Sequence, residues 1–343
     1  MRKYLLPESG NFYKANLHSH STVSDGKKSP EEMKKFYMER GYSIIAYTDH
    51  RILIGHNDLS DENFLALNGW ELDVTREQED IFTAPTCHIN FIALDPDNLI
   101  QPIWDRTENI KCGNNLLYKD QVQIDESKPD YKKVYEKEKI SEMMKIGRDA
   151  GFYVIWCHPT SSLEDYEDYI TYEGMHAMEM FNGCGLSLGY EDYHPHIYDA
   201  MIKKGKKIFC VGADDNHNGY GEPPSRVCDS FWAFTMIKAD NLEYRSITDA
   251  LLKGNFYASE GPEIYDLWYE DGKAHIKCSD ADRIYLTTYR RKIGRKFREN
   301  EPLTEATFTI PEDVEMFRIT VVDGAGKHAH TNTYFMEDIL KEK

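Results

Sequence analysis

Short apolar runs alternate with longer amphipathic stretches along residues 12–260. The short runs predict strands at 12–17, 43–47, 69–74, 87–94, 152–156, 175–181, 207–211, 230–237 and 256–259. The longer stretches predict helices at 30–40, 59–67, 140–150, 194–204 and 241–253. Strands that alternate with helices are typical of a parallel α/β sheet or barrel. In such folds the active site gathers at the carboxyl ends of the strands.

The pattern changes after Gly261-Pro262. Short alternating strands are predicted at 264–269, 274–278, 283–288, 306–310 and 316–323, with turns between them. We therefore expect an α/β domain over residues 1–262 and a small, sandwich-like all-β domain over residues 263–343. Residues 98–138 are polar and weakly periodic, and they predict an insertion over one face of the first domain, a candidate lid.

Composition and charge narrow the class of protein. The chain has 343 residues and a formal net charge of −18, which argues against a nucleic-acid surface. Its 7 cysteines include no C-x-x-C pair and lie mostly in apolar runs, so we expect buried free thiols. The sequence shows neither an apolar signal core nor a run long enough to span a membrane, and we expect a cytoplasmic enzyme without a membrane partner.

Histidines recur where predicted strands begin or end. Residues i and i+2 of a strand point the same way, so the pair in His18-Ser19-His20 leaves the first strand on one face. The full set comprises His18, His20, His50, His88, His158 and His217, joined by Asp25, Glu71 and Asp215. An isolated H-x-H pair is usually ordinary surface. If the whole set gathered on one rim without a cation, desolvated imidazoles and like-charged acids would lie against one another at a high energetic cost. A multinuclear metal site removes this conflict.

Two choices among the carboxylates stay open at this point. Glu71 and Asp73 point to the same face of one strand, where either one is a candidate ligand and a solvated strand face is the alternative. Asp214 is an alternative to Asp215. We favour Asp215 because the D-x-H spacing places it on the same side as His217.

With these motifs the sequence resembles the PHP (polymerase and histidinol phosphatase) metallohydrolases over residues 12–260. The resemblance is carried by Leu17-His18-Ser19-His20, Ser24-Asp25-Gly26, Tyr47-Thr48-Asp49-His50, Gly69-Trp70-Glu71, His88, Cys157-His158-Pro159 and Asp215-Asn216-His217. It implies a distorted (β/α)7 barrel that holds two or three divalent ions, commonly Zn, Mn or Fe. The implied ligand sets are His18, His20, Glu71 and Asp215 for one ion, Glu71, His88 and His158 for a second, and Asp25, His50 and His217 for a third.

The implied activity is metal-dependent hydrolysis of a small phosphorylated metabolite or nucleotide. A water that bridges two ions loses a proton near neutral pH and serves as the nucleophile, with Asp25 and His217 near the leaving group. Some similar-looking members hydrolyse carbamate or ester bonds, and a non-catalytic metal-containing binding module is the alternative of another class.

Three further residues receive predicted roles around the ions. Asp49 is a candidate acceptor that fixes the tautomer of a ligand histidine. Arg51 and Arg226 lie in loops that could reach the rim and bind a phosphate, with a structural salt bridge as the alternative for each.

Overall fold

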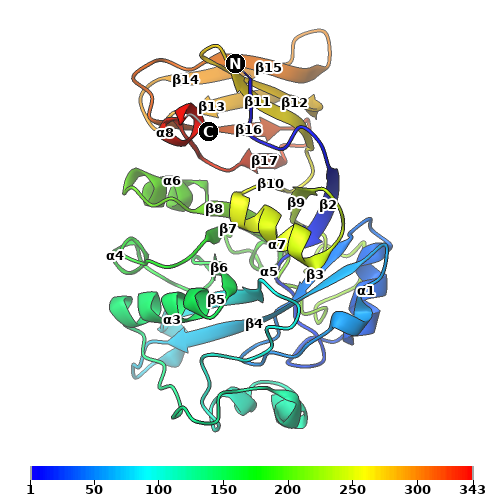
Figure 1. The fold of residues 1–343 in the computed structure, drawn as a ribbon, viewed down its shortest axis with the longest axis vertical. Helices are drawn as coiled ribbons and strands as arrows, with labels where there is room; N and C mark the ends of the chain where they lie inside the picture. The colour runs from blue at the N-terminus through cyan, green and yellow to red at the C-terminus, as the bar shows by residue number, and fades with distance from the viewer. Residues whose placement is uncertain (1, 342–343) are drawn as a thin grey trace.

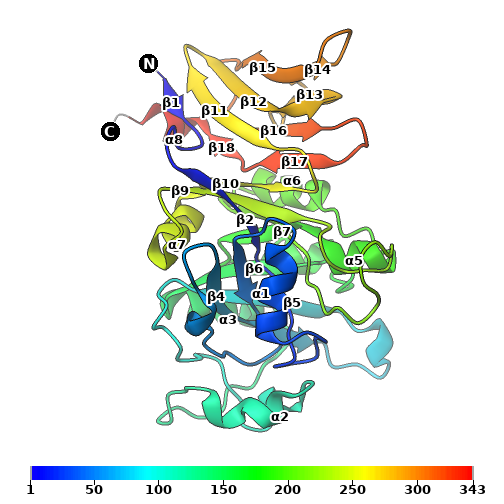
Figure 2. The same ribbon diagram turned by 90° about the vertical axis from the view of Figure 1, so that its right-hand side faces the viewer.

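Most of the predicted apolar runs form strands of one large mixed sheet. The computed structural model describes residues 2–341, with strands and helices arranged as in Figures 1 and 2. Nine strands of the sheet follow in the spatial order β10-β9-β2-β3-β4-β5-β6-β7-β8. Their bounds are β2 Asn11–Asn16, β3 Ile44–Tyr47, β4 Leu65–Thr75, β5 Thr86–Ala93, β6 Phe152–Cys157, β7 Ala177–Asn182, β8 Phe209–Ala213, β9 Phe234–Ala239 and β10 Phe256–Ser259.

The family resemblance implies a distorted (β/α)7 barrel, and the sheet of the described residues does not close into a barrel. Among residues 2–341, no backbone ladder joins β8 to β9. The Thr235 hydroxyl connects the two strands instead, since it donates to the Gly212 carbonyl oxygen (2.9 Å) and accepts from the Gly212 N–H (3.1 Å). Strand β5 also departs from the repeating unit because it runs antiparallel to both β4 and β6.

The main helices are α1 (Pro30–Met38), α3 (Lys137–Asp149), α6 (Pro195–Lys203) and α7 (Tyr244–Lys253). All four lie where the sequence predicts helices. The start of α1 is fixed by a capping box, in which the Ser29 side chain accepts from the Glu32 N–H and the Glu32 side chain accepts from the Ser29 N–H. Short helices α4 (Tyr166–Tyr169) and α5 (Gly183–Leu188) follow β6 and β7.

The helix predicted over residues 59–67 is wrong. A short 3₁₀ turn, η1, spans Asn57–Leu59, and Leu65 begins the long strand β4. The first residues of β4, Leu65–Leu67, are all apolar and buried, so no alternation marks this part of the strand. A Cβ atom at Gly69 would lie 2.8 Å from the Phe91 carbonyl oxygen, so glycine lets β4 and β5 approach closely.

The insertion between β5 and α3 forms the lowest part of the molecule in Figures 1 and 2. It contains η3 (Asn109–Lys111), α2 (Asn115–Tyr118), η4 (Lys119–Gln121) and otherwise irregular chain. The predicted insertion of residues 98–138 therefore overlaps the first two residues of α3, which begins at Lys137.

The C-terminal region is all-β until its last short helix. Strands β11 (Ile264–Glu270), β12 (Lys273–Ala281) and β15 (Leu303–Thr309) form a four-stranded sheet with β1 (Lys3–Tyr4). Strands β13 (Arg283–Thr287), β14 (Ile293–Phe297), β16 (Met316–Val322), β17 (His328–Thr331) and β18 (Tyr334–Phe335) precede α8 (Met336–Leu340). Strand β17 pairs with β10, so the large sheet continues into the C-terminal strands.

The division into domains at residues 262 and 263 stays a prediction. Strand β1, from the beginning of the chain, pairs with β11, and one apolar core contains both Tyr37 of α1 and Phe317 of β16. Residues 1, 342 and 343 of the predicted ranges lie outside the described residues. All 7 cysteines are free, as predicted, and Cys112 alone is not fully buried. No helix in the described part of the chain is long and apolar enough to cross a membrane.

Candidate metal centre

The structure brings all nine predicted metal-ligating side chains to one edge of the large sheet. Most come from loops that follow strands, and the set comprises His18 and His20 after β2, Asp25 in the next loop, His50 after β3, Glu71 in β4, His88 in β5, His158 after β6, and Asp215 and His217 after β8. His88 lies at the beginning of its strand. It reaches the same edge because β5 is antiparallel, with His88 opposite both Asp73 and Cys157.

Glu71 lies at the centre of this cluster and is fully buried. Its Oε1 atom is 2.8 Å from His88 Nδ1, 3.2 Å from His18 Nε2 and 3.3 Å from His158 Nε2. Its Oε2 atom is 2.7 Å from His50 Nδ1 and 3.5 Å from His20 Nε2. One carboxylate therefore contacts the inner and the outer histidines of the cluster.

Asp215 supplies the second buried carboxylate. Its Oδ1 atom lies 2.9 Å from His20 Nε2 and 3.2 Å from His18 Nε2, and its Oδ2 atom accepts a hydrogen bond from Asn182 Nδ2. The neighbouring Asp214 carboxylate makes no contact of this kind. It accepts hydrogen bonds from the backbone N–H groups of residues 231–233 and from the Tyr37 hydroxyl. Of the two acids, Asp215 is therefore the one that faces the histidines.

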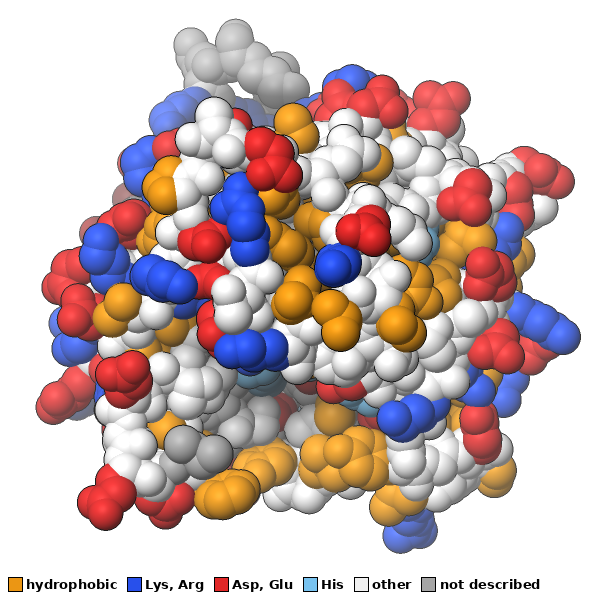
Figure 3. Space-filling model, turned by 90° about the horizontal axis from the view of Figure 1, so that it is seen from below, with side chains coloured by type: hydrophobic (Ala, Val, Ile, Leu, Met, Phe, Trp, Pro, Cys, Tyr) orange, Lys and Arg blue, Asp and Glu red, His pale blue; other side chains and the backbone are white. Residues whose placement is uncertain are grey.

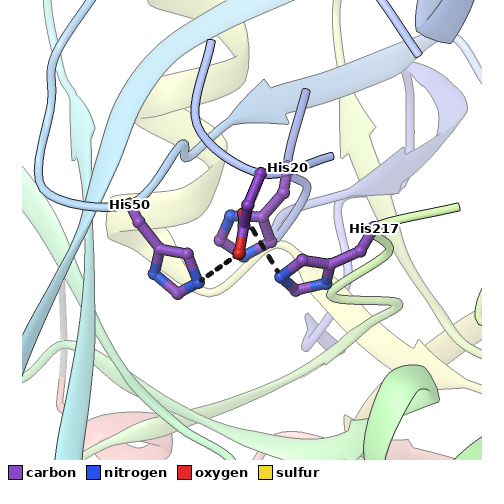
Figure 4. A group of neighbouring side chains, drawn as sticks. His20, His50 and His217 are labelled. Carbon is purple, nitrogen blue, oxygen red and sulfur yellow. Dashed lines mark ion pairs between the residues drawn. The ribbon is translucent and has the colours of Figure 1, made fainter. Parts of the chain in front are cut away.

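The outer part of the cluster consists of His20, Asp25, His50 and His217, which we call the rim group. Each offers one ligand atom within 4.8 Å of the others, and Figure 4 shows the three rings converging. Asp25 lies 3.6 Å from His217 Nε2 and 3.9 Å from His50 Nε2. The exposed fraction of the side chain rises from 0% for His20 to 40% for Asp25. Figure 3 shows histidine at the floor of a recess.

Several histidines are held through the ring nitrogen that points away from the cluster. His18 Nδ1 lies 2.8 Å from Glu179 Oε1, His158 Nδ1 2.9 Å from Ser162 Oγ, and His217 Nδ1 3.0 Å from the Asp215 carbonyl oxygen. With the proton on Nδ1, the Nε2 lone pair of each ring points into the cluster. Metal-binding histidines have this arrangement, since the outer hydrogen bond fixes the tautomer.

The cluster fits divalent metal ions on the evidence of its own polar atoms. His20 Nδ1 and Glu71 Oε2 are buried without a hydrogen-bond partner, although Oε2 lies close to His50. His18 Nε2 and His20 Nε2 lie 3.1 Å apart, and both lie within 3.2 Å of Asp215 Oδ1, so three potential ligand atoms crowd together. Cations would satisfy these lone pairs, and the nitrogen and oxygen donors suit Zn, Mn and Fe alike.

The neighbours within the cluster differ from the ligand sets that the family resemblance implies. His20 joins the rim group, His158 groups with His18 and Asp215, and Glu71 groups with His50 and His88. The number of ions and the division of ligands among them therefore stay predictions.

Charges inside the cluster are strongly coupled. Burial alone would raise the pKa of Glu71, but His88, His18 and His50 hold it well below its usual value. Burial opposes protonation of His50 and His158, but contacts with Glu71 and other carboxylates raise their pKa values to about 9 and about 10. Burial, with the His217 and His50 charges, lowers the pKa of His20 to about 4. Metal ions therefore compete with protons for His50 and His158.

Asp49 does not contact a ligand histidine as predicted. Its Oδ1 atom accepts hydrogen bonds from the N–H groups of Ser21 and Ser24 and from the Ser24 hydroxyl, and its Oδ2 atom accepts from the Ser21 hydroxyl. All four donors belong to the loop between His20 and Asp25, which lies against the Asp49 carboxylate. Asp49 therefore fixes that loop instead of an imidazole tautomer.

Of the two arginines predicted to bind phosphate, one is held in a structural ion pair. Arg51 directs Nε and Nη2 at the two carboxylate oxygens of Asp73 (2.5 and 2.6 Å), which is the structural alternative. Within β4, Asp73 is therefore occupied by an ion pair, whereas Glu71 faces the histidines. Arg226 is exposed in the loop before β9 and has no hydrogen-bond or ion-pair partner among the described residues.

Sequence reasoning missed the role of Glu179, which lies fully buried in β7. Its carboxylate accepts hydrogen bonds from His18 Nδ1, from the His158 N–H and from Asn182 Nδ2, at 2.8, 2.9 and 2.9 Å. A signal was present, because an acid within the apolar run 175–181 is costly unless it is paired. Glu179 orients two of the cluster's histidines without entering the cluster.

A second buried carboxyl, Glu164, lies in the loop after His158. It accepts hydrogen bonds from Trp156 Nε1 (2.8 Å) and the Tyr172 hydroxyl (2.7 Å), and burial raises its pKa from 4.5 to about 7. Between pH 4.5 and about 7, the Glu164 carboxyl is therefore protonated in the folded chain and ionised in the unfolded chain. Stability from this group is complete below pH 4.5 and is lost as the pH rises towards 7.

We expect Glu164→Gln to remove this pH dependence, since glutamine resembles the protonated acid. Between pH 4.5 and 8, wild type should lose about 3 kcal/mol of unfolding free energy relative to the variant. Urea unfolding followed by tryptophan fluorescence, with chelator present to exclude metal effects, measures the difference. Parallel pH profiles for the two proteins would show that Glu164 is ionised in the fold.

No protein-family model and no curated protein matches this chain. It is similar to a solved two-domain protein from Bacteroides vulgatus, described as containing a predicted PHP-like metal-dependent phosphoesterase, with 14% identity, 94% of each chain covered and a TM-score of 0.45. It is also similar to a putative metal-dependent phosphoesterase from Bifidobacterium adolescentis, with 17% identity, 64% of this chain and 91% of that chain covered, and a TM-score of 0.41.

An amidohydrolase from Chromobacterium violaceum, solved with bound sulfate and no metal, is similar at 17% identity, 64% and 94% coverage and a TM-score of 0.39.

Proposed function

We propose that this protein is a metal-dependent hydrolase of small phosphoesters, such as a phosphorylated metabolite or nucleotide. The observation that carries the proposal is the convergence of His, Asp and Glu side chains around buried Glu71, continued by the rim group to the surface. A set of nitrogen and oxygen donors that opens to solvent on one side suits catalytic ions rather than a closed structural site.

The charge of the site favours an anionic substrate. Asp25, Glu71, Glu179 and Asp215 contact the cluster's histidines, and two divalent ions would neutralise these four carboxylates. A third ion would leave a positive excess that a phosphate dianion can balance. Arg51 is occupied by Asp73, so Arg226 is the one of the two predicted guanidinium groups that has no partner among the described residues.

The bound ions would supply a nucleophilic water at neutral pH and would stabilise charge on the phosphoryl oxygens. Residues of the chain hold the geometry around them. Glu179, Ser162 and the Asp215 carbonyl orient His18, His158 and His217, so that each Nε2 points inward. Asp25 and His217 lie at the exposed rim, where a leaving group would face solvent.

His20→Ala is expected to abolish phosphate release, because His20 Nε2 belongs to both the inner contacts and the rim group. The measurement is manganese- or zinc-dependent release of phosphate from an aryl phosphate and then from a panel of phosphorylated metabolites. His275→Ala, in the C-terminal strand β12, is the matched control and should keep full activity.

Other outcomes would identify the alternative functions. Metal-loaded protein that cleaves aryl esters or carbamates but no phosphoester would identify the second type of hydrolase. Stoichiometric metal binding without any hydrolysis would favour a non-catalytic binding module.

A further inference from the structure

The insertion between β5 and α3 contacts the loop that carries Asp25. The Asn114 N–H donates to the Ser24 carbonyl oxygen (2.7 Å), and Asn114 Nδ2 donates to the Thr22 carbonyl oxygen (3.0 Å). Gly113 has a φ of +49°, and a Cβ atom there would lie 2.1 Å from the Ser24 oxygen. The insertion therefore packs against the backbone immediately before Asp25 without room for a side chain.

The same insertion holds the backbone at His50. Asn115 is fully buried, and its Nδ2 atom donates to the carbonyl oxygens of His50 (2.8 Å) and Asn109 (2.7 Å). Asn109 Nδ2 donates to the Arg51 carbonyl oxygen (2.7 Å). Arg51 has a φ of +62°, a conformation that a bulky residue adopts only where its surroundings enforce it. Two asparagines of the insertion thus hold the peptide groups on both sides of the Arg51 Cα atom.

An apolar contact completes the attachment. Val23, Ile52 and Ile54 form a small buried cluster, and Tyr118 and Val122 of the insertion pack against it. Opening the insertion as a lid would expose this cluster and leave the Arg51 backbone without its partners. The contacts therefore favour a fixed insertion.

We infer that the insertion is a fixed strap that positions Asp25 and His50 and thereby sets the affinity of the rim group for its ion. The inference rests on the proposed metal-dependent function. Asp25 and His50 make up half of the rim group, and both are held by the strap through the backbone. Glu71 lies in β4, and His18 and His158 follow directly after β2 and β6, where none of the strap's hydrogen bonds described above reaches them. Loss of the strap's hydrogen bonds should therefore weaken one ion and spare the others.

Asn115→Ala tests this inference, with Asn109→Ala as a milder second variant. Asn98→Ala is the matched control, because Asn98 Nδ2 also donates two hydrogen bonds, to the carbonyl oxygens of Ala150 (2.9 Å) and Gly151 (3.3 Å), at the other end of the insertion. Manganese binding to the full chain is measured by equilibrium dialysis and titration calorimetry. We expect about 10- to 100-fold weaker binding of one ion in both strap variants. The control should match wild type.

Two results would overturn the inference: wild-type affinity for every ion in folded strap variants, or equal weakening of all ions. Thermal unfolding reports whether each variant is folded. If Asn115→Ala does not fold, Asn109→Ala decides, since it removes one bond to the His50 loop. Failure of the proposed function would give a different result from failure of the strap. Wild type would then bind manganese but release no phosphate, and equilibrium dialysis would still measure whether the strap sets the affinity. Wild type that binds no manganese would overturn both.

Discussion

Replacement of Glu71 by glutamine is expected to remove bound metal and phosphoester hydrolysis together. Glu71 contacts five histidines of the cluster through its two oxygens and so joins the inner histidines to the rim group, as Asp215 does through four histidines. Glutamine would lose the negative charge and present an N–H₂ group to ring nitrogens. Loss of several kcal/mol of charge stabilisation corresponds to a decrease in kcat/KM of about 10³-fold or more.

The same substitution should change stability in the absence of metal. The pKa shifts of Glu71 and His50 show that each stabilises the charge of the other within the buried cluster. Removal of one partner leaves a buried charge uncompensated, which typically costs about 3–5 kcal/mol. Elemental analysis, aryl phosphate hydrolysis and urea unfolding with chelator measure the three effects on one preparation.

Asp73→Asn is the control for Glu71→Gln, because it changes the next acid on the same face of β4. Asp73 pairs with Arg51 and Lys133. The variant should be less stable but should keep its ions and its activity. Loss of metal from Asp73→Asn with retention in Glu71→Gln would reverse the assignment of the two acids.

Predictions from the sequence succeed best where local pattern decides the structure. Apolar runs specify strands because their side chains must be buried, and polar residues that follow such runs are then collected at one edge of the sheet. His18, His50 and His158 were located in this way. His88 lies at the same edge although it opens its strand. It does so because β5 runs antiparallel to its neighbours, a long-range property that the local pattern does not encode.

Predictions fail where the partner of a residue is chosen by tertiary contacts. Asp49 lies beside His50 in sequence but hydrogen-bonds to Ser21 and Ser24, whose loop folds back across it. Arg51 follows a ligand histidine but pairs with Asp73, on the adjacent strand. The pairing of β17 with β10 is likewise a long-range contact, and it joins regions that differ in sequence pattern.

The second large effect is expected at Glu179, for which the sequence pattern predicts no role. Glu179→Gln should weaken metal binding by about 10- to 100-fold, as is usual when the group that orients a ligand histidine is changed. The carboxylate accepts hydrogen bonds from His18 Nδ1, the His158 N–H and Asn182 Nδ2. Glutamine has one acceptor oxygen, so at least one of these donors would face an N–H₂ group. If His18 loses its acceptor, the Nε2–H tautomer competes and removes a lone pair from the cluster.

Glu179→Ala should go further and destabilise the fold by about 3 kcal/mol, because it leaves buried donors unpaired. Glu164→Gln is the matched control, since Glu164 is also a buried acceptor but bonds to Trp156 and Tyr172. Calorimetric titration with manganese separates the roles: a positioning role predicts weaker binding in Glu179→Gln and wild-type binding in Glu164→Gln. If Glu179→Gln lowers stability but leaves metal affinity and its pH profile unchanged, Glu179 is structural, and the strand β7 supports the cluster without orienting it.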